Sequence, residues 1–178
     1  MSAQNSSKVK GNKILKANTT NVDPFRLIEV GENFDVVLFE QGTPKVRVET
    51  DSNLHEFIVI DVSAEKLTIK TTKAISKFKK MSVEIGYNGD LSQIIAKDKV
   101  SMRGNTELNT ERTELIVSDN AEVDLNFRST RVEIKGSGKA KIKGNIEAES
   151  LALIGNDSAK MQISTNTEAV NANLAENS

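Results

Sequence analysis

The chain has 178 residues, of which 37% are hydrophobic and 28% charged, and its formal net charge is −1. It contains no cysteine, which excludes disulfides, thiolate metal sites and a cysteine nucleophile. The near-neutral charge provides no overall positive field for nucleic acid, so we expect no nucleic-acid partner. Aromatic residues make up only 4%, which argues against a binding site of stacked exposed rings.

The two ends of the sequence bear on domain organisation and location. Residues 1–9 are mostly polar and are expected to be a flexible tail, with one domain over residues 10–178. No apolar run approaches the roughly 18 residues of a membrane-spanning helix, so no membrane span is expected. The start lacks the apolar stretch of a secretory signal, which leaves either a cytoplasmic protein or one whose leader has been removed.

Apolar and polar residues alternate through most of the first half, which is typical of half-buried strands. One helical turn, or a loop, is expected over residues 52–56. The stretch 40–87 is interpreted as β-hairpins, with a turn at residues 41–44. In chain order, the alternation predicts strands around residues 25–30, 34–38, 46–48, 58–62, 67–69 and 83–85.

From about residue 90 an eleven-residue unit recurs, with apolar residues at positions 1, 3, 9 and 11 and turn formers at 5 and 6. The ninth-position residues Val100, Val123, Ala140 and Met161 recur about every 20 residues, which is a solenoid spacing. The segments between units are expected to be loops. The copies are 115–125, 132–142 and 153–163, a weaker one at 92–102 and an outlying one at 28–38.

This spacing predicts an all-β fold, a right-handed parallel β-helix of about 20-residue rungs with β-hairpins in the N-terminal half. An antiparallel sandwich of short strands is the alternative. Residues 172–178 match only the first seven positions of the unit, so we expect an incomplete last rung. Either the chain is cut short there, or its free edge pairs with another molecule and gives a homo-oligomer.

A basic run supplies the candidate ligand-binding residues Lys73, Lys77, Lys79 and Lys80, with Lys70 nearby. These lysines could form a patch for an anion or polysaccharide. The alternative is a solvated loop, which is the usual role of such a run.

An acidic column at position 5 of the unit is a second candidate, because stacked oxygen ligands would suit calcium. The column is interrupted at Ala96 and Gly136, and Asp and Asn also favour turns because they tolerate left-handed backbone. We therefore expect turn formers and no metal or other cofactor. The residues concerned are Glu32, Asp119, Asp157 and Glu176 at position 5, and Asn33, Asn120 and Asn177 at position 6.

No catalytic residues are predicted. His55, the single histidine, lies in an expected turn and lacks the partners of a charge relay or a metal site. A polysaccharide-active β-helix enzyme, lyase or hydrolase, is the alternative, and it would require paired acids in a groove. The outward-facing charges alternate in sign, as in cross-strand ion pairs: Glu122, Asp124, Arg131, Glu133, Lys135, Lys139, Lys141 and Lys143.

Four segments resemble one bacterial family. Residues 25–38 (FRLIEVGENFDVVL) look like its opening F-x-x-I-x-V-x-G-x-x-D-V-x-L, and residues 67–70 (LTIK) its L-x-I-K strand. Residues 46–54 (VRVETDSNL) look like its strand and short acidic turn, and residues 135–140 (KGSGKA) its G-S-G corner. The other corners depart from the pattern, with DNA at 119–121 and DSA at 157–159.

The chain is thus similar to the "head GIN" domain, also called the "putative auto-transporter adhesin" domain. The resemblance implies a β-helix and export to the periplasm or cell surface through a leader missing here, with a cytoplasmic location left open. It implies no established activity and no catalytic residues. The leading hypothesis is a non-catalytic envelope module that presents a rigid surface to a cell-surface protein or glycan.

Overall fold

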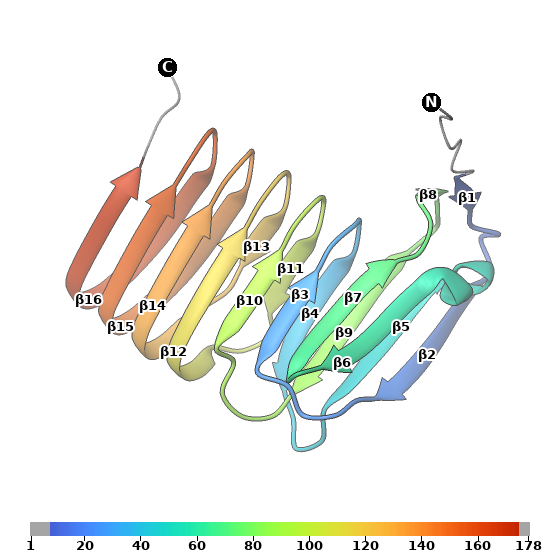
Figure 1. Ribbon diagram of the computed structural model, residues 1–178, viewed down its shortest axis with the longest axis horizontal. Coiled ribbons are helices and arrows are strands. Elements are labelled where there is room, and N and C mark those ends of the chain that lie inside the picture. The colour runs from blue at the N-terminus through green and yellow to red at the C-terminus, as the bar shows by residue number, and fades with distance from the viewer. Residues whose placement is uncertain (1–7, 175–178) are drawn as a thin grey trace.

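The computed structural model describes residues 8–174, and nearly all of its regular structure is β-strand (Figure 1). Most of the expected N-terminal tail and the end of the expected incomplete rung lie outside the described residues. The strands are β1 (Val9–Lys10), β2 (Leu15–Asn21), β3 (Leu27–Val30), β4 (Asp35–Glu40), β5 (Lys45–Asp51), β6 (Ile58–Ser63), β7 (Lys66–Thr71), β8 (Ile75–Lys77), β9 (Met81–Tyr87), β10 (Gln93–Ala96), β11 (Ser101–Gly104), β12 (Leu108–Val117), β13 (Glu122–Asp124), β14 (Phe127–Gly136), β15 (Lys141–Gly155) and β16 (Lys160–Leu174).

The strands expected in the first half are confirmed, but the turn at residues 41–44 does not form a hairpin, because β4 and β5 lie on opposite sides of β9 and do not pair with each other. Alternation places Val46 and Val48 in the core and leaves their neighbours partly exposed, as in a half-buried strand. The expected helical turn is a 3-10 helix, η1 (Ser52–Phe57), which buries Leu54. A hairpin joins β6 to β7, and its two turn residues, Ala64 and Glu65, both have positive φ.

The prediction of a right-handed parallel β-helix is wrong. Fourteen strands form one mixed sheet in the order β2-β5-β9-β4-β11-β13-β15-β14-β12-β10-β3-β7-β6, and β16 joins β15. Strand β5 pairs antiparallel with β2 and β9, and β6 pairs antiparallel with β7. The first-half strands that break the expected period therefore belong to the same sheet as the strands of the second half. The short strands β1 and β8 form their own two-stranded sheet.

The pairing register of the second half also differs from the expected one. Strands β12, β14, β15 and β16 are parallel neighbours whose partners lie 19 residues apart, as in Leu115, Ile134 and Leu153. Val123 pairs with Met102 and Ile142, not with Val100 and Ala140. The expected register is two residues off, and a two-residue shift leaves every side chain on its original face. The hydrophobic pattern therefore could not reveal the error.

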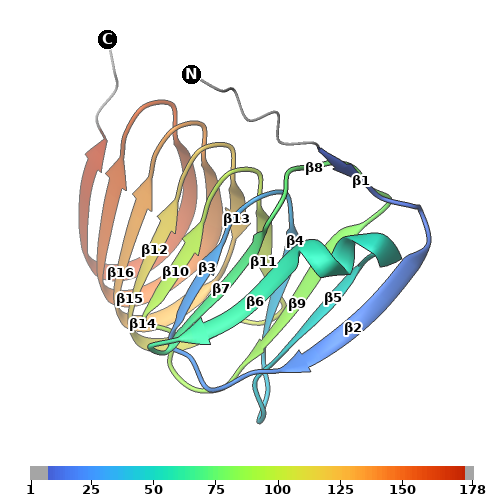
Figure 2. The same cartoon turned by 45° about the vertical axis from the view of Figure 1, so that its right-hand side comes forward.

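The segments between the recurring units are strands, not loops. Residues 127–131 belong to β14 and residues 145–152 to β15, and both segments pair in parallel with their neighbours. Figure 2 shows that the sheet bends back on itself, with the core enclosed between its two limbs. Phe34 and Phe127 are among the largest fully buried side chains of this core.

Ion pairs cross neighbouring strands on the outer surface of the sheet. Glu29 binds Lys66 and also Lys97, the latter at 2.6 Å, and Glu114 binds Lys135 at 2.6 Å. The hydrogen bond from Lys66, followed by that from Lys97, lowers the pKa of Glu29. The hydrogen bond from Lys135 lowers the pKa of Glu114. Both carboxylates therefore stabilise the fold most when they are ionised.

This arrangement predicts a loss of stability in acid. A carboxyl whose pKa falls on folding stabilises the protein above its unfolded pKa, near 4.5, and the contribution disappears as the pH drops through the folded value. Each of Glu29→Gln and Glu114→Gln should lower the free energy of unfolding at pH 7 by up to about 1 kcal/mol, since these pairs are partly exposed. In urea titrations, the free energy of unfolding of both variants should decline less steeply below pH 4.5 than that of wild type. The exposed Glu56 is the control, and an equal effect of Glu56→Gln would contradict the prediction.

Candidate functional site

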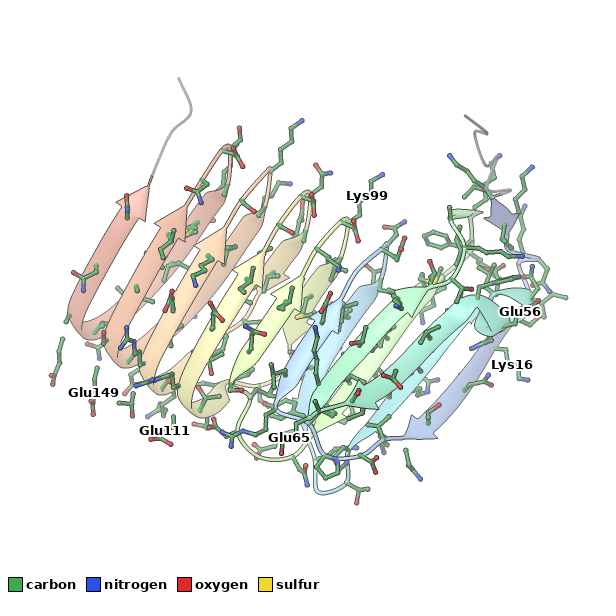
Figure 3. The ribbon with its side chains drawn as sticks, in the orientation of Figure 1. Lys16, Glu56, Glu65, Lys99, Glu111 and Glu149 are labelled. Atoms are coloured by element: carbon green, nitrogen blue, oxygen red, sulfur yellow. The ribbon has the colours of Figure 1, made fainter. Side chains whose placement is uncertain are left out.

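A groove of about 910 Å³ crosses the bend of the four long strands β12, β14, β15 and β16. Figure 3 shows Glu111 and Glu149 on the same bend, with their side chains pointing away from the strands. Asp90, which precedes β10, lies at the end of the groove near β12. The lining residues are Asp90, Asn109, Thr110, Glu111, Arg128, Ser129, Thr130, Glu147, Ala148, Glu149, Asn166, Thr167 and Glu168.

The groove arises from the parallel register of these strands. One row consists of Asn109, Arg128, Glu147 and Asn166, which are successive partners on neighbouring strands. Parallel strands lie about 4.8 Å apart, so the row presents one polar group at each such step. The pairing ladder omits Glu111, Thr130, Glu149 and Glu168. The chain turns at these unpaired residues, and their side chains therefore project outward.

The groove is acidic. Arg128 is its one cation, and it binds Glu107 at 2.9 Å and Glu147 at 3.1 Å. The hydrogen bond to Glu107 raises the pKa of Arg128, and the charge of Glu147 adds to the shift. Asp90 accepts the backbone N–H of Glu111 at 3.1 Å and also binds Arg26 at 3.3 Å. The lining contains five carboxylates and no aromatic ring. It can therefore accept hydrogen bonds and attract cationic groups, but it has no ring on which a ligand could stack.

Two threonines of β12 provide a matched test of packing beneath the groove. The hydroxyl of Thr110 is buried without a partner within residues 8–174, whereas Thr113 donates to the carbonyl of Leu91 at 2.7 Å. An apolar residue of the same shape removes an unsatisfied group in the first case and a hydrogen bond in the second. Thr110→Val should therefore be neutral or stabilising by about 1 kcal/mol, and Thr113→Val should destabilise by about 1 kcal/mol. Urea unfolding distinguishes them, and the opposite order would contradict this account.

The candidate lysines do not converge on one site. Lys77 and Lys79 line a separate hollow of about 530 Å³. Lys80 binds Glu49 at 2.8 Å, and the amine of Lys73 lies 4.9 Å from the centre of the Phe57 ring. Two of the four lysines are thus engaged by their own neighbours.

The acidic column consists of turn residues that bond to backbone. Asp98 accepts the N–H of Glu32 at 2.7 Å, and Asp157 accepts that of Gly138 at 3.1 Å. Asp119 accepts the N–H of Asp98 at 3.3 Å, and all five residues have positive φ. The residues level with this column are therefore Asp98 and Gly138, not Ala96 and Gly136, so the column continues through Asp98 and is interrupted at Gly138. Among residues 8–174, no three His, Asp or Glu side chains are grouped to hold a metal. Glu176 and Asn177 lie outside the described residues.

His55 has a structural contact, since its Nε2 lies 2.9 Å from the backbone oxygen of Lys16. Figure 3 shows Lys16 and Glu56 at this end of the molecule, away from the groove. Cross-strand charge pairing is confirmed for three of the expected residues, since Lys141 binds Glu122 and Lys135 binds Glu114. Lys135 binds Glu133 at 2.9 Å on its own strand as well as Glu114 on β12.

Sequence reasoning missed the groove because its residues lie in segments expected to be loops. The signal was present as a spacing of 19 residues between Glu111, Thr130, Glu149 and Glu168. Aligning the sequence with itself at this 19-residue period, with polar as well as apolar positions included, would have revealed these four groove residues.

These observations define an all-β protein with a mixed sheet and an acidic groove across its bend. The family model for "Putative auto-transporter adhesin, head GIN domain" matches residues 24–178, and the chain belongs to this family. A search of curated proteins finds no match. No helix within residues 8–174 is long and apolar enough to cross a membrane.

Three solved structures share the fold. A "putative adhesin" from Parabacteroides merdae has a TM-score of 0.77 at 19% identity, over 93% of this chain and 79% of that one. A second, from Parabacteroides distasonis, has a TM-score of 0.77 at 24% identity, over 93% and 70%. A "putative lipid binding protein" from Parabacteroides distasonis has a TM-score of 0.64 at 10% identity, over 94% and 100%.

Proposed function

We propose that the protein is a non-catalytic, adhesion-like module of the periplasm or cell surface, and that the acidic groove is its contact surface. The observation that supports this proposal is a row of polar side chains from four neighbouring strands, which includes one carboxylate and is flanked by four more. Such a row suits an extended ligand, because contacts recur at each strand along its length. The family and the names of its structural neighbours support adhesion as the role.

The chemistry of the lining favours one class of ligand. Carboxylate and amide oxygens accept hydrogen bonds, so the groove should bind a cell-surface glycan or protein segment rich in hydroxyl, ammonium or guanidinium groups. Ala148 is the single apolar lining residue, which does not favour the acyl chain of a lipid.

The test compares two pairs of exposed glutamates. Binding to a glycan array that includes amino sugars, and to a panel of basic peptides, is measured for wild type, Glu111→Gln/Glu149→Gln and the control Glu56→Gln/Glu65→Gln. The four positions are labelled in Figure 3. We expect the groove variant to lose binding that the control retains. Equal binding by both variants, or no ligand for wild type, would overturn the proposal.

One observation favours the alternative of a polysaccharide-active enzyme, namely the five carboxylates of the groove. Paired acids 5–9.5 Å apart are what glycoside hydrolysis needs. Incubation of the arrayed polysaccharides with wild type separates the two functions. A binding module leaves chain length unchanged, whereas cleavage that is lost in Glu111→Gln/Glu149→Gln would replace the proposal by an enzyme.

A further inference from the structure

A basic hollow of about 530 Å³ lies beside the small sheet of β1 and β8. It is lined by Lys13, which lies between β1 and β2, by Lys77 at the end of β8, and by Lys79 shortly after it. Among residues 8–174, no carboxylate belongs to the lining. Figure 1 shows β1 and β8 side by side at the end of the molecule opposite β16, so the hollow is separate from the acidic groove.

A buried carboxylate fixes the backbone on both sides of this hollow. Asp51 accepts the N–H of Lys13 and, at 2.7 Å, that of Lys79. Gly11, which also lines the hollow, packs on the same side chain, since a Cβ built there would lie 2.6 Å from Cγ of Asp51. Two segments that are distant in the sequence are therefore held around one space.

The three lysines of the hollow have no counter-charge in the part of the chain that the structure describes. Lys13, Lys77 and Lys79 form no ion pair there, whereas Lys80, the next residue along the chain, binds Glu49 at 2.8 Å. Positive charges that are gathered without partners create a local potential that attracts anions. The hollow thus differs from the rest of the basic run, where Lys80 is already neutralised.

A further like-charge contact strengthens this local field. Lys77 is the partner of Lys10 in the ladder between β1 and β8, and like charges on directly opposite residues destabilise a ladder. Residues 1–7, which precede β1 in the sequence, contain no Asp or Glu. The buried charge of Asp51 offsets only one of the lysines, so a bound anion would relieve the repulsion that remains.

Phe78 gives the hollow an apolar wall. It lies between Lys77 and Lys79 in the sequence, lines the same space, and is half-buried against the core. Ligand sites typically combine such an apolar surface with a few charged groups that fix the orientation of the ligand. A suitable ligand therefore carries an oxyanion on a body with an apolar face, and the volume of the hollow lies in the usual range for a small ligand.

We propose that this hollow binds an acidic sugar residue of a glycan, with its carboxylate or sulfate held by Lys13, Lys77 and Lys79 and its ring against Phe78. Ammonium groups form short, strong hydrogen bonds with oxyanions. The site takes ligands of the opposite charge to those of the acidic groove. It goes beyond the proposed function and does not depend on it.

The experiment is calorimetric titration of the full chain with three oligosaccharides of equal length, one containing glucuronate, one sulfated and one neutral. Wild type should bind at least one acidic probe at least about tenfold more tightly than the neutral probe. The hollow variant, Lys77→Gln/Lys79→Gln, should weaken that binding at least about tenfold. Its matched control is Lys70→Gln/Lys73→Gln, which removes two charges of the same run outside the hollow and should leave binding within about twofold of wild type.

Lys13→Asn separates loss of binding from loss of the fold. Lys13 has a φ of 65°, a left-handed backbone that Asn adopts more readily than Lys. The substitution should therefore leave the free energy of unfolding unchanged or raise it, while binding of the acidic probe weakens. Phe78→Leu keeps an apolar side chain on the core but removes the ring, and it should also weaken this binding.

Two further comparisons decide the proposal. The groove variant Glu111→Gln/Glu149→Gln should bind the acidic probe as wild type does, so failure of the groove and failure of the hollow can be told apart. A wild type that does not distinguish acidic from neutral probes would overturn the proposal. Equal weakening by the hollow variant and its control, or unchanged binding in Lys13→Asn and Phe78→Leu, would do the same.

Discussion

Replacement of Asp51 by alanine is expected to destabilise the protein by about 2–4 kcal/mol. Asp51 ends β5, is 0% exposed, and accepts the backbone N–H groups of Lys13 and Lys79, the latter at 2.7 Å. It thereby ties two distant chain segments to the sheet. Loss of the carboxylate leaves both donors without an acceptor, and because the site is partly buried each should cost about 1–2 kcal/mol, the lower part of the range for such groups.

The measurement is urea unfolding followed by circular dichroism, with two reference variants. Asp51→Asn keeps one side-chain oxygen and should lose about half as much free energy of unfolding as Asp51→Ala. Asp61→Ala removes an exposed aspartate from β6 and should change it by less than about 0.5 kcal/mol. Similar losses for Asp51→Ala and Asp61→Ala would show that the Asp51 contacts do not hold these segments.

Substitution of Gly144 is the second large effect. A Cβ built at this position lies 1.9 Å from the backbone oxygen of Leu125, far inside van der Waals contact. The amide of Leu125 donates to the carbonyl of Lys143 at 3.1 Å, so these two segments of the backbone approach closely where β13 ends. Because the obstacle is backbone, it cannot rotate away, and Gly144→Ala should cost about 2–3 kcal/mol.

Gly42 supplies the control for this substitution. A Cβ at Gly42 meets nothing within 4 Å, so Gly42→Ala should change the free energy of unfolding by less than about 0.5 kcal/mol. Thermal and urea unfolding of the two variants side by side give the comparison. Equal stability of Gly144→Ala and Gly42→Ala would mean that the backbone segments at Gly144 and Leu125 are not in close contact.

The local elements of the fold were predictable because they depend on side-chain alternation. Val46 and Val48 alternate with polar neighbours, and that pattern identifies a strand without knowledge of its partner. Which strands pair is a long-range property. Nothing in residues 58–71 indicates that β6 and β7 extend the same sheet as β16, so a parallel coil with separate hairpins was expected in place of one mixed sheet.

The site was harder to predict for the same reason. Glu111 and Glu149 lie 38 positions apart in the printed sequence and share a groove only through the register of three strands. The candidate lysines are close in sequence but diverge in space, because Lys80 turns to Glu49 and Lys73 to Phe57. Nearness in sequence was a poor guide to a surface that neighbouring strands assemble.

The groove depends on the 19-residue register that aligns its rows, and engineered disulfides test this register directly. Arg128 and Glu147 are exposed partners on β14 and β15, and parallel neighbours lie within the 4.4–6.8 Å Cα separation of a disulfide. Arg128→Cys/Glu147→Cys should therefore cross-link under mild oxidation in a chain that has no other cysteine. Arg128→Cys/Asn145→Cys shifts the pairing by two residues, the size of the register error described above, and its Cα atoms should be too far apart, so its thiols should remain free. A cross-link in the second variant and free thiols in the first would contradict the groove as described.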